Sequence, residues 1–263
     1  MPRITFLKSK NKPTKLFDLE GNKIDFGREV AVVDLAVPVP PISEVLDEND
    51  WATIKEVCEA GEAGNYWAVG DVKKVTGGDT HERSVAIVDM TGLYSKHVVF
   101  QFMDLTDATY AIDADSFNDY SASDMNVTYL AAGGAIRTEI LDEALSAELT
   151  DTTVKVAQNG NIGATLVEVT NKLFLPAERE VWTTLAYSVQ AEFDALATFE
   201  YWQTNTANAD HVLKSPADDT AHDWWTRSPR EGGTVRVCSV AGNGSANYFN
   251  VSTALPVSSC FSF

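Results

Sequence analysis

The sequence predicts an α+β fold, and three observations lead to this prediction. Residues 43–60 and 130–149 carry apolar side chains at helical spacing. Short segments rich in β-branched and aromatic residues recur along the chain and dominate its last part. Turns that contain Gly and Asn separate these late segments, as at Ala241-Gly242-Asn243-Gly244. Helices placed early and short strands placed late are typical of an α+β domain.

The first helix is expected within residues 43–60, where Ser43, Asn49 or Asp50 can cap it and Gly61 follows its end. Its apolar face comprises Trp51, Ile54, Val57 and Cys58. A second long helix is expected over residues 130–149 and a short one over 177–182, whereas residues 187–222 have a mixed pattern. Strands are expected at residues 72–75, 85–90, 97–102, 154–157, 166–169, 235–240, 246–251 and 259–263.

Residues 1–42 differ from the rest of the chain. Short strand-like runs occur at residues 4–7, 15–19 and 24–26, and an apolar, β-branched run over 30–39 ends in the prolines of VPVPP. We therefore expect a β-rich N-terminal arm, residues 1–42, before a domain of residues 43–263. Such an arm can attach the domain to another subunit, but the same residues can also form the first hairpin of the domain.

The chain has 263 residues, 38 Asp and Glu, 20 Lys and Arg, and a formal net charge of −18. This charge disfavours nucleic acid and anionic membranes as partners. No stretch resembles a signal peptide or a membrane span, so we expect synthesis in the cytoplasm without a signal peptide. The three cysteines, Cys58, Cys238 and Cys260, are too scattered for a zinc site or a disulfide framework, which predicts buried free thiols.

Four segments carry a resemblance to a known family. They are Trp51-Ala-Thr-Ile-Lys-Glu-Val-Cys-Glu-Ala-Gly, Asn65-Tyr-Trp-Ala-Val-Gly-Asp, Leu173-Phe-Leu-Pro-Ala-Glu-Arg-Glu-Val and Asp223-Trp-Trp-Thr-Arg-Ser-Pro. In this order they resemble a domain of unknown function that is common in gut bacteria, their prophages and phages. Its C-terminal half resembles the C-type-lectin fold of formylglycine-generating enzymes and of the variable proteins of diversity-generating retroelements.

The resemblance covers residues 48–263, with one departure. Family members end with a Gly-Val-Arg-Pro-like segment, whereas this chain ends with Leu255-Pro-Val-Ser-Ser-Cys-Phe-Ser-Phe and lacks that Arg. The resemblance implies a C-type-lectin-like domain on a phage virion. It also implies other virion proteins as partners of the N-terminal arm, a host-surface carbohydrate or protein as a further partner, and a homo-oligomeric assembly.

The variable proteins carry their variable positions on the last strands and loops, and residues 230–253 of this chain are rich in small polar and aromatic side chains. Tyr provides contact area at a low entropy cost, and Ser and Asn provide adaptable hydrogen bonds. The alternative is an ordinary polar loop. The candidate ligand-binding residues are Arg230, Thr234, Arg236, Asn243, Ser245, Asn247, Tyr248 and Asn250.

Trp224-Trp225-Thr226-Arg227-Ser228-Pro229 is interpreted as scaffold rather than as a binding site. Each indole can bury about 200 Å² and anchor a small β core. The guanidinium of Arg227 is a donor fork that can satisfy carbonyls in the irregular backbone that follows. The motif therefore predicts a buried structural centre next to the candidate binding residues.

Metal and catalytic signals are weak, and no metal and no cofactor are expected. Asp113, Asp115 and Asp119 fail the EF-hand pattern because Asn118 replaces its Gly and Asp124 replaces its final Glu. The acidic group Asp218, Asp219, His222 and Asp223 is equally unspecific, and Cys238 and Cys260 do not form a close pair in one segment. HExxH, GxSxG and phosphate-loop motifs are absent from the sequence. The chain is therefore expected not to be an enzyme.

The first functional hypothesis is a virion-associated binding protein, on the head or the tail, that displays a C-type-lectin-like face to a host-surface or other ligand. The second is a structural decoration or adaptor protein of the capsid without a receptor role. A bacterial surface or secreted binding module and an enzyme of unknown type are the remaining alternatives. Adenine-rich codons at residues 230–253 beside a reverse-transcriptase gene would favour a diversified receptor-binding protein.

Overall fold

The computed structural model describes residues 16–17, 23–24, 41–96, 98–115 and 118–263. The chain divides into two compact units, Met1–Pro41 and Ile42–Phe263. In the first unit, β1 (Leu16–Phe17) pairs antiparallel with β2 (Lys23–Ile24). The strand-like runs at residues 4–7 and 30–39 lie outside the described residues, and the attachment role of the arm stays a prediction.

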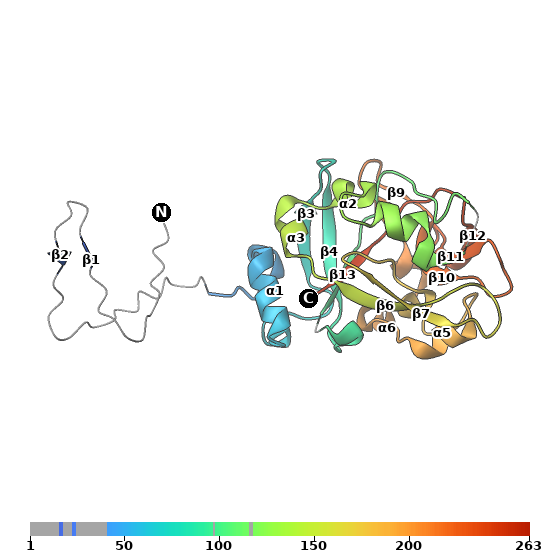
Figure 1. The fold of residues 1–263 in the computed structure, drawn as a ribbon, viewed down its shortest axis with the longest axis horizontal. Helices are drawn as coiled ribbons and strands as arrows, with labels where there is room; N and C mark the ends of the chain where they lie inside the picture. Colours follow the sequence, from blue (N-terminus) through green and yellow to red (C-terminus); the bar gives the residue numbers. More distant parts are fainter. Residues whose placement is uncertain (1–15, 18–22, 25–40, 97, 116–117) are drawn as a thin grey trace. The chain divides into compact units, whose positions relative to one another are not determined.

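A four-stranded antiparallel sheet forms the centre of the second unit, with the strand order β13-β5-β4-β3 (Figure 1). Strands β4 and β5 are buried along most of their length, whereas β3 alternates between exposed and buried positions. Cys260 of the last strand pairs with Gln101 of β5, so residues far apart in the sequence share one sheet. The bounds are β3 Val72–Thr76, β4 Glu82–Asp89, β5 Val99–Phe102 and β13 Cys260–Ser262.

Helix α1 (Trp51–Glu59) packs against this sheet through the apolar face that its sequence predicts. The Asp50 side chain caps the helix by accepting the amide hydrogen of Thr53 at 2.7 Å. The Trp51 ring meets the edges or faces of Phe100, Phe261 and Phe263, with ring centres 5.7 to 6.3 Å apart. This aromatic group therefore joins helix α1 to the region of the neighbouring strands β5 and β13.

The single helix predicted over residues 130–149 is wrong. The structure has a π-helix, Met125–Tyr129, followed by α2 (Ala135–Ile140) and α3 (Glu143–Glu148). Gly133 adopts a left-handed φ of 73°, which ends the helical path before α2. The Asp142 side chain then accepts the amide hydrogen of Leu145 at 2.6 Å and caps a new helix. The apolar spacing identified buried side chains but not the breaks between the helices.

Among its described residues, the second unit has three further antiparallel arrangements, of which the pair β8–β9 is the shortest. Strands β6 and β7 form a regular hairpin from Thr152↔Asn171 to Ala157↔Leu166, and β10, β11 and β12 form a three-stranded sheet. The bounds are β6 Thr152–Ala157, β7 Leu166–Asn171, α4 Glu178–Val181, α5 Gln190–Ala195, α6 Glu200–Thr204, β8 Lys214–Ser215, β9 Thr220–Ala221, β10 Trp224–Pro229, β11 Arg236–Val240 and β12 Ala246–Asn250. Short 3-10 turns cover Leu46–Glu48, Ala63–Asn65, Leu93–Ser95, Tyr120–Ala122 and Asn208–His211.

The scaffold interpretation of the Trp-Trp-Thr-Arg-Ser-Pro motif agrees with strand β10, whose six residues are all buried. Trp224 and Trp225 are both 0% exposed, and Arg227 donates to the backbone oxygens of Leu175 and Lys155. The β10–β11 pairing is irregular between Trp225 and Pro229. Arg227 therefore satisfies backbone carbonyls, but those of two earlier segments and not, as was expected, those of the backbone that follows it.

The structure confirms a mixed α+β class. The expected order, with helices early and strands late, is wrong because α4, α5 and α6 lie between β7 and β8. In Figure 1 the unit's first helix, α1, and strand β12 lie at opposite ends of the second unit. Among the described residues, no helix combines the length and apolar character needed to cross a bilayer.

Candidate functional site

The hairpin β11–β12 brings three of the candidate binding residues to one face. Arg236 pairs with Asn250, and Cys238 pairs with Tyr248. Side chains alternate between the faces of a sheet, so residues 236, 248 and 250 share a face. Asn247 lies on the other face together with Phe249, whose ring packs edge-on against the buried Trp225 at 6.3 Å.

Tyr248 is the centre of a compact aromatic and cationic group. Its ring meets that of Tyr187 edge-to-face, with centres 4.9 Å apart. The guanidinium carbon of Arg230 lies 4.2 Å from the centre of the Tyr248 ring, and that of Arg236 lies 5.3 Å from it. We call Tyr187, Arg230, Arg236 and Tyr248 the Tyr248 cluster.

The two arginines of the Tyr248 cluster differ from Arg83 and Arg227, which both pair with carboxylates. Within the part of the chain that the structure describes, neither Arg230 nor Arg236 forms an ion pair or a side-chain hydrogen bond. Both guanidiniums lie over the Tyr248 ring, and no carboxylate of a described residue comes within ion-pair distance of them. In a chain with a net charge of −18, this leaves a local cationic spot.

The backbone around Tyr187 is held by a buried carboxylate. Glu178 is 0% exposed and accepts the amide hydrogens of Ala186, Tyr187 and Ser188 at 2.7 to 3.1 Å. Ser188 also forms an antiparallel bridge with Arg230. Helix α4 and the end of β10 therefore position two members of the cluster together.

A hollow of about 280 Å³ lies beside the Tyr248 cluster. Ile162, at the tip of the β6–β7 hairpin, is 84% exposed, and Leu185 is 37% exposed. Ser188 is 1% exposed, and its Oγ is buried without a hydrogen-bond partner, as is Nε of Arg230. We define the hollow by its lining residues Ile162, Leu185, Ala186, Tyr187, Ser188, Arg230, Glu231 and Gly232.

The other candidate residues are not members of the Tyr248 cluster, although Asn250 shares the face of Arg236 and Tyr248. Thr234 is exposed in the loop before β11, and Asn250 is exposed at the end of β12. Asn243 accepts hydrogen bonds from the amide and hydroxyl of Ser245 at 3.1 and 2.8 Å, which makes these two residues part of the β11–β12 turn. The candidate residues therefore divide into members of the Tyr248 cluster, two residues of the β11–β12 turn, and residues outside both groups.

Sequence reasoning missed Tyr187, Ser188, Leu185 and Ile162. Residues 185–188 are irregular and 162 is in a hairpin loop, so neither segment has a periodicity that identifies a face. The sequence signal that could have identified these residues is composition. Several apolar and aromatic residues together in a turn region indicate a surface that is covered or binds another molecule.

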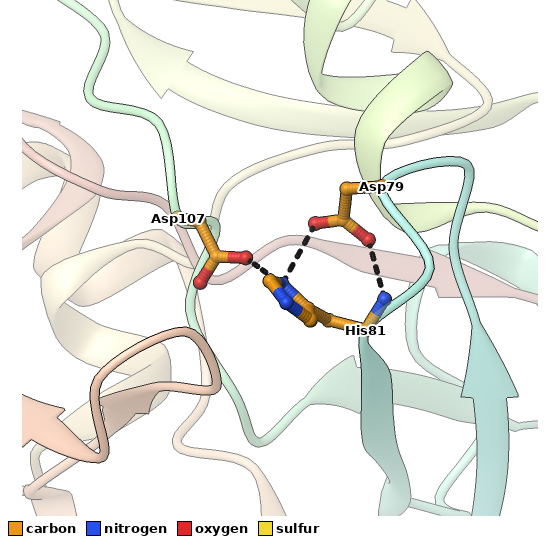
Figure 2. Close-up of side chains that lie close together, drawn as sticks. All are labelled: Asp79, His81 and Asp107. Atoms are coloured by element: carbon orange, nitrogen blue, oxygen red, sulfur yellow. Dashed lines mark hydrogen bonds and ion pairs between the residues drawn. The ribbon is translucent and has the colours of Figure 1, made fainter.

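A second polar group lies at the turn between β3 and β4 (Figure 2). His81 Nδ1 is 2.5 Å from an oxygen of Asp107 and 3.8 Å from one of Asp79. Burial alone would raise the pKa of Asp107, but hydrogen bonds from Ser215, His81 and Ala217 and the charge of Arg83 lower it to about 2. Asp107 is therefore charged at any physiological pH.

Asp79, His81 and Asp107 offer ligand types that suit a divalent cation. The buried Arg83, however, places Nη2 2.6 Å from Asp79 and 3.2 Å from Asp107. The same guanidinium also lies 3.3 Å from Glu139. A cation between these carboxylates would have to displace the guanidinium or lie against it, so the geometry is that of an ion-pair cluster.

Arg227 forms a third polar group, inside the core. It donates to both oxygens of Glu180, each at 2.6 Å, with both side chains essentially unexposed. The neighbouring Glu192 accepts a hydrogen bond from Ser228 and another from the amide of Ala157. Burial raises the pKa of Glu192 to about 7, although Arg227 and these hydrogen bonds oppose the shift.

The remaining acidic and thiol candidates have local structural roles. Asp119 caps a short 3-10 turn, and Asp113 accepts the amide hydrogen of Asp115. His222 pairs with Asp218 at 3.6 Å on the surface. The prediction of buried free thiols is confirmed, since Cys58, Cys238 and Cys260 are all free and buried.

Residues 93–262 match the model of a domain of unknown function (DUF6273), and the chain belongs to this family. The matched region includes the whole Tyr248 cluster and every residue that lines the hollow. No curated protein matches the chain. No solved structure matches it either.

Proposed function

We propose that this chain is a virion-associated binding protein of a bacteriophage, not an enzyme. In this proposal a C-type-lectin-like domain, residues 43–263, displays the Tyr248 cluster to a host-surface or other ligand. The fold assignment rests on the resemblance of the four sequence motifs and is compatible with the mixed α+β architecture. The single observation that carries the binding role is the Tyr248 cluster beside the hollow.

The composition of the Tyr248 cluster supports recognition of another molecule. Tyr and Arg are enriched among the residues that dominate binding energy at protein interfaces. Rigid aromatic side chains bury a large area with little loss of conformational entropy. The lining residues that the structure describes offer no nucleophile hydrogen-bonded to a general base, which favours binding over catalysis.

The arm, residues 1–42, is proposed to attach the domain to other virion proteins, and the assembly is proposed to be a homo-oligomer. Strand β12 and helix α1 lie at opposite ends of the second unit (Figure 1), and in this proposal the end with β12 is the displayed one. Removing residues 1–40 should leave the domain folded and abolish its incorporation into particles. Loss of soluble folding would instead assign these residues to the domain core.

A capsid decoration or adaptor role is the second candidate. The observation that favours it is the exposure of Ile162, Leu185 and Val235, since apolar side chains suit a contact that is permanently covered. In that case the Tyr248 cluster would be an assembly interface between virion subunits. The same fold would then serve without a receptor role.

An electron cryomicroscopy map of the particle that carries the chain separates the two candidates. An outward-facing Tyr248 cluster supports display, whereas a cluster buried against neighbouring subunits supports the adaptor role. A map in which the chain is absent from the particle contradicts both.

A competition experiment tests ligand binding directly. The purified full chain should reduce adsorption of its phage to host cells, and Tyr248→Ala should lose this effect while the melting temperature changes little. Asn247→Ala is the matched control, because Asn247 lies on the opposite face of β12 and should compete normally. Equal competition by both variants would mean that the ligand binds elsewhere.

A further inference from the structure

We propose that the Tyr248 cluster and the hollow recognise an acidic segment of a partner protein. A carboxylate of this segment pairs with Arg230 and Arg236, and an adjacent apolar side chain enters the hollow. This inference rests on the proposed binding function and specifies the chemistry of its ligand.

The first argument is charge. Both guanidiniums lie within 5.3 Å of the Tyr248 ring centre, so they are separated by at most roughly 10 Å, about one Debye length. They repel each other, and the structure pairs neither with a carboxylate of a described residue. A ligand carboxylate that approaches both guanidiniums would relieve this repulsion and accept charge-assisted hydrogen bonds.

The second argument is the pair of buried polar atoms without partners. Nε of Arg230 and Oγ of Ser188 are both donors, and both belong to residues that line the hollow. An unsatisfied buried donor costs free energy that a ligand acceptor recovers. The one carboxylate in the lining, that of Glu231, already accepts the amide hydrogen of Gln190 at 3.2 Å.

The third argument is the apolar lining, which favours a peptide over an acidic polysaccharide. Ile162 and Leu185 present aliphatic surface beside the cationic spot, whereas a sugar requires many polar partners. The hollow, about 280 Å³, is smaller than the roughly 300–1,000 Å³ of typical small-molecule sites. It suits one apolar side chain of an extended segment.

Contacts on two sides hold the backbone that surrounds the hollow. Glu178 holds residues 186–188 from one side. On the other side, Gly160 contacts the loop after β10 so closely that a Cβ would lie 2.1 Å from the oxygen of Arg230. Preorganised walls reduce the entropy cost of binding.

The test selects short random peptides, displayed on yeast, against the immobilised full chain. Peptides with Asp or Glu next to Leu, Ile or Phe should be enriched. Their affinity should fall roughly thirtyfold or more for the double variant Arg230→Gln, Arg236→Gln. Ile162→Glu, at an exposed position, should also abolish binding without affecting folding, whereas Val45→Glu, a control at another exposed position before α1, should not.

The outcomes separate this inference from the proposed function. Enriched peptides that are neutral or basic, but lost with Tyr248→Ala, overturn the acidic ligand and leave the binding role intact. Peptides that bind all cluster variants equally overturn both. Absence of enrichment, or binding of polygalacturonate that is sensitive to the same variants, overturns the peptide class. If the double arginine variant fails to fold, Ile162→Glu alone decides.

Discussion

Glu178 accepts the backbone amide hydrogen of Tyr187 through both carboxylate oxygens, at 3.0 and 3.1 Å. The same carboxylate serves the two neighbouring amides, of Ala186 and Ser188. The fully buried carboxylate of Glu178, in α4, thus provides the hydrogen-bond acceptors that a neighbouring strand would otherwise provide to this segment. The position of Tyr187 against Tyr248 therefore depends on a buried side chain that holds the backbone of Tyr187.

Replacing Glu178 with Ala should therefore weaken both the fold and ligand binding. Three backbone amides would lose their acceptor, and the free energy of unfolding should fall by about 1–3 kcal/mol. Hydrogen exchange at residues 186–188 should accelerate, as measured by mass spectrometry. Glu168→Ala, at an exposed position in β7, is the control and should change neither quantity. Unchanged exchange at residues 186–188 would contradict the anchoring role.

Gly160→Ala should move the β6–β7 loop away from the hollow. A Cβ at this position would lie 2.1 Å from the oxygen of Arg230 and 2.3 Å from that of Gly233, so the backbone must shift. We expect a loss of about 1–3 kcal/mol in stability, as for other overpacked sites. In Gly64→Ala the Cβ would lie 3.9 Å from the Met90 side chain, an ordinary van der Waals contact, so this variant should be nearly neutral. Thermal melts of the two variants provide the comparison, and equal melting temperatures would argue against close contact.

Glu192 should make stability depend on pH near neutrality. Its pKa rises from 4.5 to about 7 in the folded chain because of burial. Between these values the unfolded state releases its proton while the folded state keeps it, so this group lowers stability as pH rises from about 4.5 to about 7. Glu192→Gln should flatten that part of the profile in denaturant titrations. A profile identical to that of the parent chain would show that Glu192 ionises normally.

Trp225→Ala should be strongly destabilising, by about 3–5 kcal/mol. The indole is 0% exposed, donates to the backbone oxygen of Tyr110 at 2.9 Å and packs against Phe249. The change would leave a large cavity beneath β12 and remove one of the two hydrogen bonds that the Tyr110 carbonyl accepts, the other coming from the amide of Leu255. Denaturant unfolding measures the loss, and an unaltered midpoint would contradict the scaffold role of this motif.

Local patterns in the sequence predicted the elements whose signals are local. The apolar face of α1, the strands of the central sheet and the burial of Trp224 and Trp225 all follow from periodicity or from side-chain size. The prediction of one long helix over residues 130–149 was wrong because the apolar spacing continues across the breaks before and after α2. The residues Gly133 and Asp142 were the stronger signals of these breaks, because Gly133 adopts a positive φ and Asp142 caps a new helix.

The candidate site was only partly predictable. Arg230, Arg236 and Tyr248 do come together, but Asn247 lies on the opposite face, as strict alternation along the predicted strand 246–251 would have required. Tyr187 joins them through a hydrogen-bond arrangement around Glu178 that no sequence spacing reveals. Long-range contacts of irregular segments depend on tertiary packing, which a single sequence does not encode in any periodic form.

The pairing of Cys260 with Gln101 has a consequence for biosynthesis. Strands β3, β4 and β5 can associate as soon as they leave the ribosome, since they are close in sequence. Their outer edge, at β5, nevertheless stays open until β13 has been translated. During that interval Phe100 has neither Phe261 nor Phe263 to cover it. The nascent chain thus exposes an apolar strand edge for most of its synthesis. We therefore expect the sheet to be completed late and slowly, and the incomplete chain to be sensitive to aggregation.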